Sequence, residues 1–249
     1  MSASDSVARS AQAAPSQLLE PNAGYQRWAS IYDQTPNPLL SREERYFEPR
    51  VPTLSGKQAL DVACGTARWL HKFMARGANR AVGLDLSPAM LRVARQKVEF
   101  GQRLIQADCR SLPLTDQTFD FAMCSFTLSH LEDLRPATQE LSRVLRSGSL
   151  LLVSDLHPQA YAQGWRTGFR DGDGPVEIRT VPRPAEEFIK SFVSAGFECL
   201  NQVSLHLGDA ERATFAAAGR EHYFEHACRV PAILALSFKR SYRKPGKRY

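Results

Sequence analysis

The chain has 249 residues, of which 43% are hydrophobic and 23% are charged. This composition supports a packed core and excludes global disorder, and with a mean hydropathy of −0.34 it contains no apolar run long enough for a membrane span. The first residues are rich in Ser, Ala and Gln and lack an apolar stretch, which excludes a secretory signal. We therefore expect a flexible leader over residues 1–20.

The positive charge of the chain gathers at its C-terminal end. Residues 239–249 contain six Lys and Arg and no acid, whereas the other 26 basic residues match the 26 acidic ones. A basic tail can contact phosphates, but a solvated end is the simpler interpretation. We expect a basic tail over residues 239–249 and no nucleic-acid partner. The sequence leaves open whether the protein is a monomer or a homodimer.

The cysteines and histidines do not form a recognisable metal or disulfide framework. The five cysteines are widely spaced, odd in number and without a Cys-x-x-Cys pair. This pattern fits a reducing cytoplasm. His222 and His226 stand four residues apart, as metal ligands on a helix can, but no third ligand is in register. We expect no bound metal.

From about residue 58 to residue 155, short apolar runs alternate with amphipathic segments. Strands are predicted over residues 58–63, 81–84, 103–107, 119–124 and 150–154, and helices over residues 67–76 and 135–146 and after Ser87-Pro88. Because strand-helix-strand units cross over right-handed, this order predicts a doubly wound, mostly parallel α/β sheet.

The flanking segments are predicted to complete one domain over residues 21–238. Residues 21–50 form a helical lid, with helices over residues 23–32 and 41–47. Residues 155–230 carry insertions on the substrate side. The elements expected beyond the alternating region are a loop over residues 164–174, a helix over residues 184–195 and strands over residues 197–207 and 230–238.

Polar residues follow the strand ends, where open α/β sheets bind ligands. The first strand runs into Asp61-Val62-Ala63-Cys64-Gly65-Thr66-Ala67, the second ends at Asp85 and the third at Asp108-Cys109. A turn with little side-chain bulk lets backbone N–H groups face an anionic group at a helix N-terminus. These features predict a ligand site at this edge of the sheet.

Together these residues resemble the class I S-adenosylmethionine-dependent methyltransferases, in the small-molecule branch that includes ubiquinone and menaquinone C-methyltransferases. The resemblance covers residues 25–154 and implies a Rossmann-like, seven-stranded, mostly parallel sheet and S-adenosylmethionine as the cofactor. The family loop reads acid-x-Gly-x-Gly-x-Gly, and this chain has Asp61, Ala63, Gly65 and Ala67 there. Ala63 is an easy replacement if its φ is negative, whereas the Ala67 methyl is expected where the methionine end approaches.

The resemblance also implies a role for each matching residue. Asp85 would bind the ribose, and Asp108 the adenine amino group. The other implied cofactor contacts are the loop at Asp61, Ala63 and Gly65, the adenine neighbours Leu86, Met90 and Cys109, and the carbonyls around Cys124 and Ser125. Tyr25 and Tyr32 lie in a segment similar to the family's Tyr-x-x-x-Tyr-Asp entry helix, with a longer spacing, and would cover the sulfonium. A plain amphipathic helix is the alternative.

The implied reaction is methyl transfer to a small-molecule acceptor by in-line displacement, in which alignment is the main source of rate. A base is needed only for an un-ionised acceptor, and the candidates are His130, His157 and Asp155. We favour His157, with Asp155 orienting it or acting alone. His130 suits a structural role at a helix start equally well.

The second half of the chain is expected to wall the acceptor pocket. Its candidate residues are Trp165, Phe169, Phe188, Phe192, Tyr223, Arg166, Arg170 and Arg179. Two other functions stay open: binding of S-adenosylmethionine without methyl transfer, and an RNA methyltransferase, favoured only by the basic tail. Residues 124–127 lack the Asn/Asp/Ser-Pro-Pro-aromatic run of nucleobase amine methyltransferases, and the first loop lacks the dinucleotide fingerprint.

Overall fold

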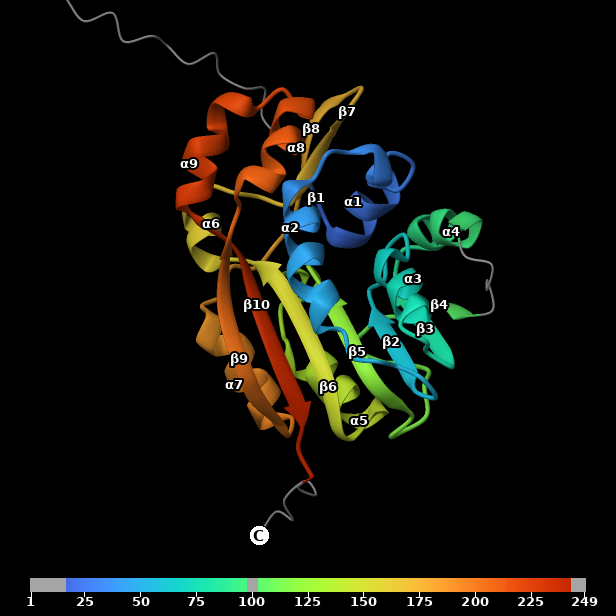
Figure 1. Cartoon of the computed structure of the whole chain (residues 1–249). Coiled ribbons are helices and arrows are strands. Elements are labelled where there is room, and N and C mark those ends of the chain that lie inside the picture. The colour runs from blue at the N-terminus through green and yellow to red at the C-terminus, as the bar shows by residue number, and fades with distance from the viewer. Residues whose placement is uncertain (1–16, 98–102, 243–249) are drawn as a thin grey trace, which may run out of the picture.

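A seven-stranded sheet forms the centre of the computed structural model, which describes residues 17–97 and 103–242 (Figure 1). The strands lie in the order β4-β3-β2-β5-β6-β10-β9. Their bounds are β2 (Gln58–Val62), β3 (Arg80–Asp85), β4 (Leu104–Gln106), β5 (Phe119–Ser125), β6 (Leu145–Leu156), β9 (Phe197–His206) and β10 (Pro231–Arg240). Neighbours from β4 to β6 are parallel, whereas β10 is antiparallel to β6 and β9. The predicted mostly parallel, seven-stranded α/β fold is confirmed.

Helices cover both faces of this sheet, because side chains of a strand point alternately to opposite faces. Ala59 belongs to a core shared with α2 and α3, and Leu60 belongs to a second core shared with α5 and α7. The α-helices are α1 (Pro21–Trp28), α2 (Pro38–Phe47), α3 (Arg68–Ala75), α4 (Pro88–Lys97), α5 (Arg135–Val144), α6 (Pro158–Ala162), α7 (Ala185–Ser194), α8 (Arg212–Ala217) and α9 (Phe224–Arg229). The short 3₁₀ turns used below are η1 (Tyr32–Gln34) and η4 (Leu128–His130).

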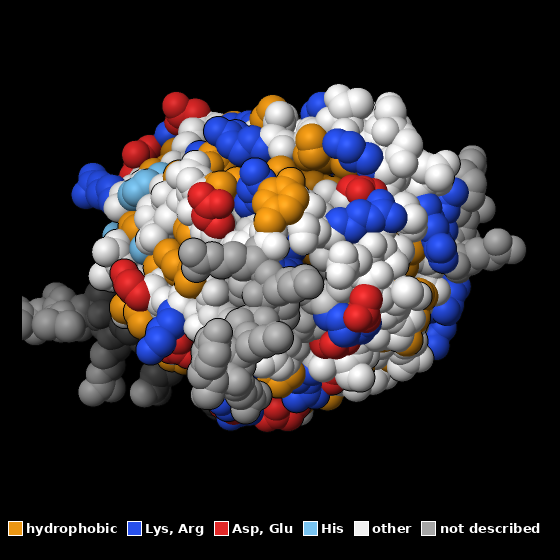
Figure 2. All heavy atoms as spheres, turned by 90° about the horizontal axis from the view of Figure 1, so that it is seen from below, with side chains coloured by type: hydrophobic (Ala, Val, Ile, Leu, Met, Phe, Trp, Pro, Cys, Tyr) orange, Lys and Arg blue, Asp and Glu red, His pale blue; other side chains and the backbone are white. Residues whose placement is uncertain are grey.

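The carboxyl ends of the parallel strands meet at one end of the molecule, at the top of Figure 1, where α1 lies above the sheet. The opposite end is seen in Figure 2, where Lys and Arg side chains are interspersed with Asp and Glu. Among the described helices, none combines the length and apolar character needed to cross a membrane. Within the same residues, no three His, Cys, Asp or Glu side chains are grouped to hold a metal.

A second, three-stranded sheet corrects two sequence expectations. β1 (Gln17–Leu19) pairs in parallel with β8 (Gly174–Ile178), which is antiparallel to β7 (Gly168–Asp171). Residues 17–19 are therefore a strand rather than leader, and residues 164–174 include most of a hairpin rather than a loop. Gly172 and Asp173 form the tight turn between β7 and β8, and strands this short carry no readable periodicity. Residues 1–16 lie outside the described residues.

Two element boundaries also differ from the sequence prediction. The helix expected to reach residue 146 ends at Val144, and β6 begins at once with the buried Leu145. Gly148, two residues beyond the predicted helix end, lies inside β6 with a φ of +84°, beside an irregular register with β5. β10 extends through Arg240, whose guanidinium donates to the carbonyls of Ser142 and Gly196. The start of the expected tail is therefore sheet, and residues 243–249 lie outside the described residues.

The hairpin offers a matched pair of glycines. A Cβ on Gly168 would clash with the carbonyl oxygen of Val176, whereas a Cβ on Gly172 would meet no atom within 4 Å. We expect Gly168→Ala to lower the free energy of unfolding by about 1–3 kcal/mol and Gly172→Ala to change it by less than about 0.5 kcal/mol, as measured by urea unfolding. Equal effects of the two substitutions would contradict the described pairing of β7 with β8.

Candidate active site

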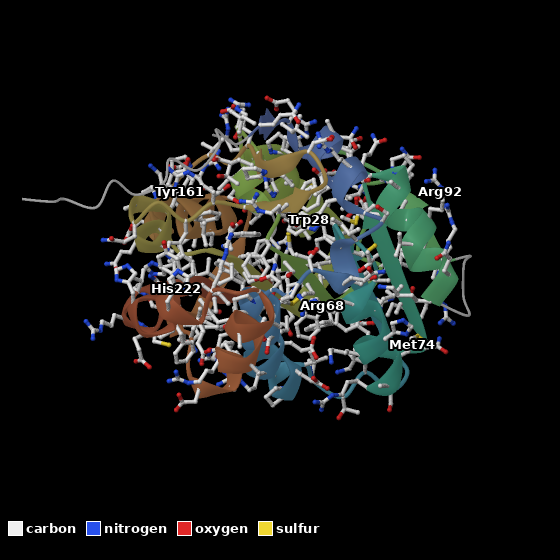
Figure 3. The ribbon with its side chains drawn as sticks, turned by 90° about the horizontal axis from the view of Figure 1, so that it is seen from above. Trp28, Arg68, Met74, Arg92, Tyr161 and His222 are labelled. Carbon is white, nitrogen blue, oxygen red and sulfur yellow. The ribbon has the colours of Figure 1, made fainter. Side chains whose placement is uncertain are left out.

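A cavity of about 390 Å³ opens at the carboxyl ends of β2, β3 and β5, beneath α1. Its lining includes most of the predicted site residues: Tyr25, Tyr32, Asp61, Ala63, Gly65, Asp85, Leu86, Met90, Asp108, Cys109 and His130. Further lining residues include Arg68, Ser125, Phe126, Thr127 and Arg179. Seen from above, Arg68 and Trp28 lie toward the middle of the molecule, whereas Arg92, Tyr161 and His222 lie toward its edge (Figure 3).

The turn between β2 and α3 is built from left-handed backbone. Ala63, Gly65 and Ala67 have φ values of +57°, +54° and +69°. The φ of Ala63 is therefore positive, and not negative as an unstrained replacement of glycine requires. An alanine in this conformation costs roughly 1–2 kcal/mol. Ala67, whose methyl is expected where the methionine end approaches, is fully buried in the core and is not part of the cavity lining.

Asp85 ties this turn to the end of β3. Its carboxylate accepts the backbone N–H of Gly65 at 2.9 Å with one oxygen and that of Ser87 at 2.8 Å with the other. Burial raises the pKa of Asp85, and the two backbone hydrogen bonds oppose the shift. Each carboxylate oxygen can accept a second hydrogen bond from the cavity, as two ribose hydroxyls require.

Asp61 supplies an unsatisfied acceptor at the inner end of the cavity. The residue is 1% exposed, and its Oδ2 has no hydrogen-bond partner among the described residues. Burial raises the pKa of Asp61 well above its ordinary value, although the nearby Arg68 opposes the shift. A buried carboxylate oxygen without a donor fits a ligand that brings its own N–H groups, such as an α-ammonium.

Another part of the cavity lining combines apolar side chains with Asp108, whose carboxylate is already paired with an arginine. Leu86, Met90 and Cys109 all line the cavity, and burial raises the pKa of the Cys109 thiol to about 12. The Asp108 carboxylate is held by the side chain of Arg110, which lowers its pKa. Asp108 therefore faces the predicted adenine region while already paired with a cation.

The lid covers the cavity with aromatic rings. Tyr32 packs edge-on against Trp28 at 4.8 Å between centroids, and burial raises the pKa of Tyr32 to about 12. Asp33 in η1 fastens this segment to the loop by accepting the Thr66 hydroxyl at 2.7 Å, and it also pairs with Lys97 on α4. The lid is therefore bound directly to the turn between β2 and α3.

His130 faces the cavity with one ring nitrogen engaged on each side. Nδ1 lies 2.8 Å from the carbonyl oxygen of Arg179, and Nε2 lies 2.9 Å from the Tyr25 hydroxyl. Because a carbonyl only accepts, Nδ1 carries the proton, and Nε2 accepts from Tyr25. Burial lowers the pKa of His130, against smaller opposing effects of the Arg179 carbonyl and of Asp155. The ring is therefore neutral at pH 7, with its basic lone pair toward Tyr25.

Three predicted site residues lie outside the cavity lining. His157 is the N-cap of α6: its Nδ1 accepts the Gln159 backbone N–H, and its Nε2 therefore donates to Ser204. Asp155 accepts the backbone N–H of Ser129 beneath η4. Cys124 is fully buried in the second core. The chain turns into a helix directly after β6 and carries His157 away, so the structure brings His130 but not His157 to the cavity lining.

The acceptor walls expected from residues 155–230 are also largely wrong. Of the eight residues proposed, Arg179 alone lines the cavity. Phe169 instead stacks on Trp28 at 5.0 Å, and Phe188 and Phe192 fill the second core. The cavity is walled by the lid and by residues 125–132, because the second half of the chain packs around these elements rather than over the sheet edge.

The comparisons with known proteins agree with this geometry. Residues 60–153 match a family model described as a methyltransferase domain. A demethylmenaquinone methyltransferase from Staphylococcus carnosus is 29% identical over 78% of this chain and 82% of its own length, and one from Bacillus cereus is 36% identical over 55% and 58%. A solved S-adenosylmethionine-dependent methyltransferase from Mesorhizobium loti shares the fold, with a TM-score of 0.64, 23% identity and coverage of 80% and 98%.

Residues 60–153 thus match a methyltransferase domain, and the chain has the fold of a solved S-adenosylmethionine-dependent methyltransferase. Its cofactor is S-adenosylmethionine, and the residues present fit that molecule. Asp61 has an acceptor without a donor, Asp85 has acceptor capacity toward the cavity, and Ala63, Gly65 and Ala67 form a turn with little side-chain bulk.

Sequence reasoning missed one buried residue of this methyltransferase, Glu43 on α2. Its carboxylate accepts the Ser125 hydroxyl at 2.6 Å, and it also bonds to Ser154 and to the cavity-lining Arg68. Glu43 lies in a helix with several other charged residues, so nothing in the sequence around it predicts that this one is buried. The side chain is fully buried, and it links the lid to the ends of β5 and β6.

The strained loop gives a stability prediction. We expect Ala63→Gly to raise the free energy of unfolding by about 0.5–1 kcal/mol, because glycine relieves the left-handed strain but loses more backbone entropy on folding. Ala94→Gly in right-handed α4 is the control, and it should lower that free energy by about 1 kcal/mol or more. Both values are measured by urea unfolding. Destabilisation by both substitutions would contradict the loop conformation.

Asp85 gives a binding prediction. We expect Asp85→Ala to weaken the binding of S-adenosylhomocysteine roughly 10- to 100-fold, because two ribose hydroxyls would lose their acceptor. Calorimetric titration measures the change. Asp116→Ala removes an exposed acid that pairs with Arg143 away from the cavity, and it should leave affinity unchanged. Native affinity in the Asp85 variant would show that the ribose lies elsewhere.

Proposed function

We propose that the chain transfers the methyl group of S-adenosylmethionine to a small aromatic acceptor with an ionisable hydroxyl, such as a quinol, and that Tyr25 and His130 receive the acceptor's proton. The observation that carries this proposal is the neutral His130, whose basic Nε2 accepts from Tyr25 inside the cavity. When bound, the cofactor supplies a methyl carbon from which a nucleophile displaces a neutral thioether in line.

The chain's own residues are assigned to holding and orienting this cofactor. We assign the ribose hydroxyls to Asp85, the α-ammonium to Asp61 and the adenine to the walls at Leu86 and Met90. The aromatic lid residues Tyr25 and Tyr32 exclude water and face the sulfonium with π-systems, which favour a cation.

The proton path follows from the tautomer of His130. Tyr25 passes its own hydroxyl proton to Nε2 and accepts the acceptor's proton, and the Arg179 carbonyl stabilises the imidazolium through Nδ1. Loss of the acceptor's proton makes its oxygen, or a ring carbon conjugated to it, more nucleophilic. The names of the two relatives support a quinone-type acceptor, since both methylate a demethylmenaquinone.

Isotope transfer tests the activity. The protein is incubated with methyl-labelled S-adenosylmethionine and chemically reduced demethylmenaquinone with a short side chain, and separately with a panel of simple phenols and a metabolite extract. We expect label in an aromatic product. Binding of S-adenosylhomocysteine without label in any acceptor would favour the alternative of a cofactor-binding protein that transfers no methyl group.

Variants of Tyr25, His130 and His157 test the proposed route of the proton. Tyr25→Phe and His130→Gln should each slow turnover roughly 10²-fold, whereas His157→Asn, which keeps a good N-cap for α6, should stay near native. Wild-type turnover should rise with pH through a midpoint below 6.5, because burial lowers the pKa of His130 and the neutral ring is the active form. A slow His157→Asn enzyme with a normal His130→Gln enzyme would reverse the assignment.

We place the methyltransferase in a reducing cytoplasm. All five cysteines are free thiols, and Cys64 and Cys124 are buried. Burial raises the pKa of both thiols, which disfavours the reactive thiolate.

A further inference from the structure

A buried arginine lies directly behind the segment that carries His130. Arg183, just before α7, is 5% exposed, yet it belongs to neither core and is not part of the cavity lining. It forms an ion pair with Glu187, at 2.9 Å, whose side chain is itself 54% exposed. Taking a guanidinium out of water is costly unless its N–H groups are satisfied.

The other donors of Arg183 are directed at backbone carbonyls of residues 128–132. Nη2 donates to the carbonyl of Glu132 at 2.7 Å and to that of Leu131, and Nη1 lies 3.5 Å from the carbonyls of Leu128 and Val181. Three of these four carbonyls belong to η4 and the two residues after it, and that of Leu128 also accepts the Leu131 backbone N–H at 3.1 Å. The last carbonyls of a helical turn commonly need partners from outside the turn. The arginine therefore acts as a C-cap supplied from a distant part of the chain.

The same segment is held from two other sides. The Ser129 carbonyl accepts the Val181 backbone N–H at 2.6 Å, and the Ser129 N–H donates to Asp155 at 2.8 Å. These contacts surround His130, the next residue, whose Nδ1 donates to the Arg179 carbonyl. Residues 179–183 thus supply one partner to the His130 ring and several to its backbone.

We propose that Arg183 is a positioning residue for His130. Its guanidinium fixes the backbone of residues 128–132 against residues 179–183, so that the ring keeps Nδ1 on the Arg179 carbonyl and Nε2 toward Tyr25. This inference rests on the role proposed for His130 in the methyl transfer. A lysine cannot replace the planar guanidinium of Arg183, because its single ammonium does not reach carbonyls on both sides of the turn.

Ring nitrogen spectra of His130 test the proposal without an acceptor. The protein is labelled with ¹⁵N-histidine and saturated with S-adenosylhomocysteine, and the His130 signals are assigned from their absence in His130→Gln. The charged and titratable groups packed around the ring are Tyr25 on α1, Asp155 on β6 and Arg179. The wild type should show one neutral tautomer, protonated at Nδ1, and a titration midpoint below 6.5.

Arg183→Gln should bind S-adenosylhomocysteine within about 3-fold of wild type, yet show a mixture of the two tautomers and a midpoint shifted upward toward 6.5. Glu187→Gln removes the exposed partner but keeps the carbonyl contacts, and it should resemble wild type. Arg183→Lys keeps the charge and serves if the glutamine variant does not fold; it too should lose the single tautomer. Wild-type ring signals in either folded Arg183 variant would overturn the proposal, whether or not methyl transfer is observed.

Discussion

The hydrogen bond from the Gly65 amide to the Asp85 carboxylate joins the ends of two neighbouring parallel strands, and the cavity is organised around it. The bond holds the turn between β2 and α3, in which Ala63, Gly65 and Ala67 have left-handed backbone. It also leaves the second acceptor sites of Asp85 directed at the cavity. The same carboxylate therefore has two roles. Asp85 shapes the turn and also offers the hydrogen-bond acceptor that a nucleoside needs.

Charge is divided between the two sides of this cavity. The lid contributes buried or half-buried acids, including Asp33 and Glu43, and the helices that follow β2 and β3 contribute Arg68 and Lys97. Each pair joins residues 21–50 to a helix that packs on the sheet, so each contact neutralises charge on both partners. Residues 21–50 are thus held by complementary charge and by aromatic packing beside the cavity.

The sequence was a good guide wherever the determinant was local or repeated. Alternating apolar runs predicted the sheet, and acids directly after strands predicted Asp61, Asp85 and Asp108 at its edge, because parallel strands place their carboxyl ends together. It failed where partners are distant. Glu43 is defined by Ser154, 111 residues away, and the choice between His130 and His157 depends on how η4 and α6 leave their strands. Neither the residue types nor their spacing predict the direction in which the chain continues after β5 or after β6.

The parallel pairing of β1 with β8 attaches the first described residues to the hairpin of the substrate side. Arg27 on α1 strengthens this attachment through Asp171 and Asp173 in the same hairpin. The segment above the cavity, residues 17–34, is consequently held at both ends. Asp33 in η1 binds it to Thr66 and Lys97, and β1 and Arg27 bind it to the hairpin. This segment therefore depends for part of its support on Asp171, which lies 144 positions after Arg27 in the chain.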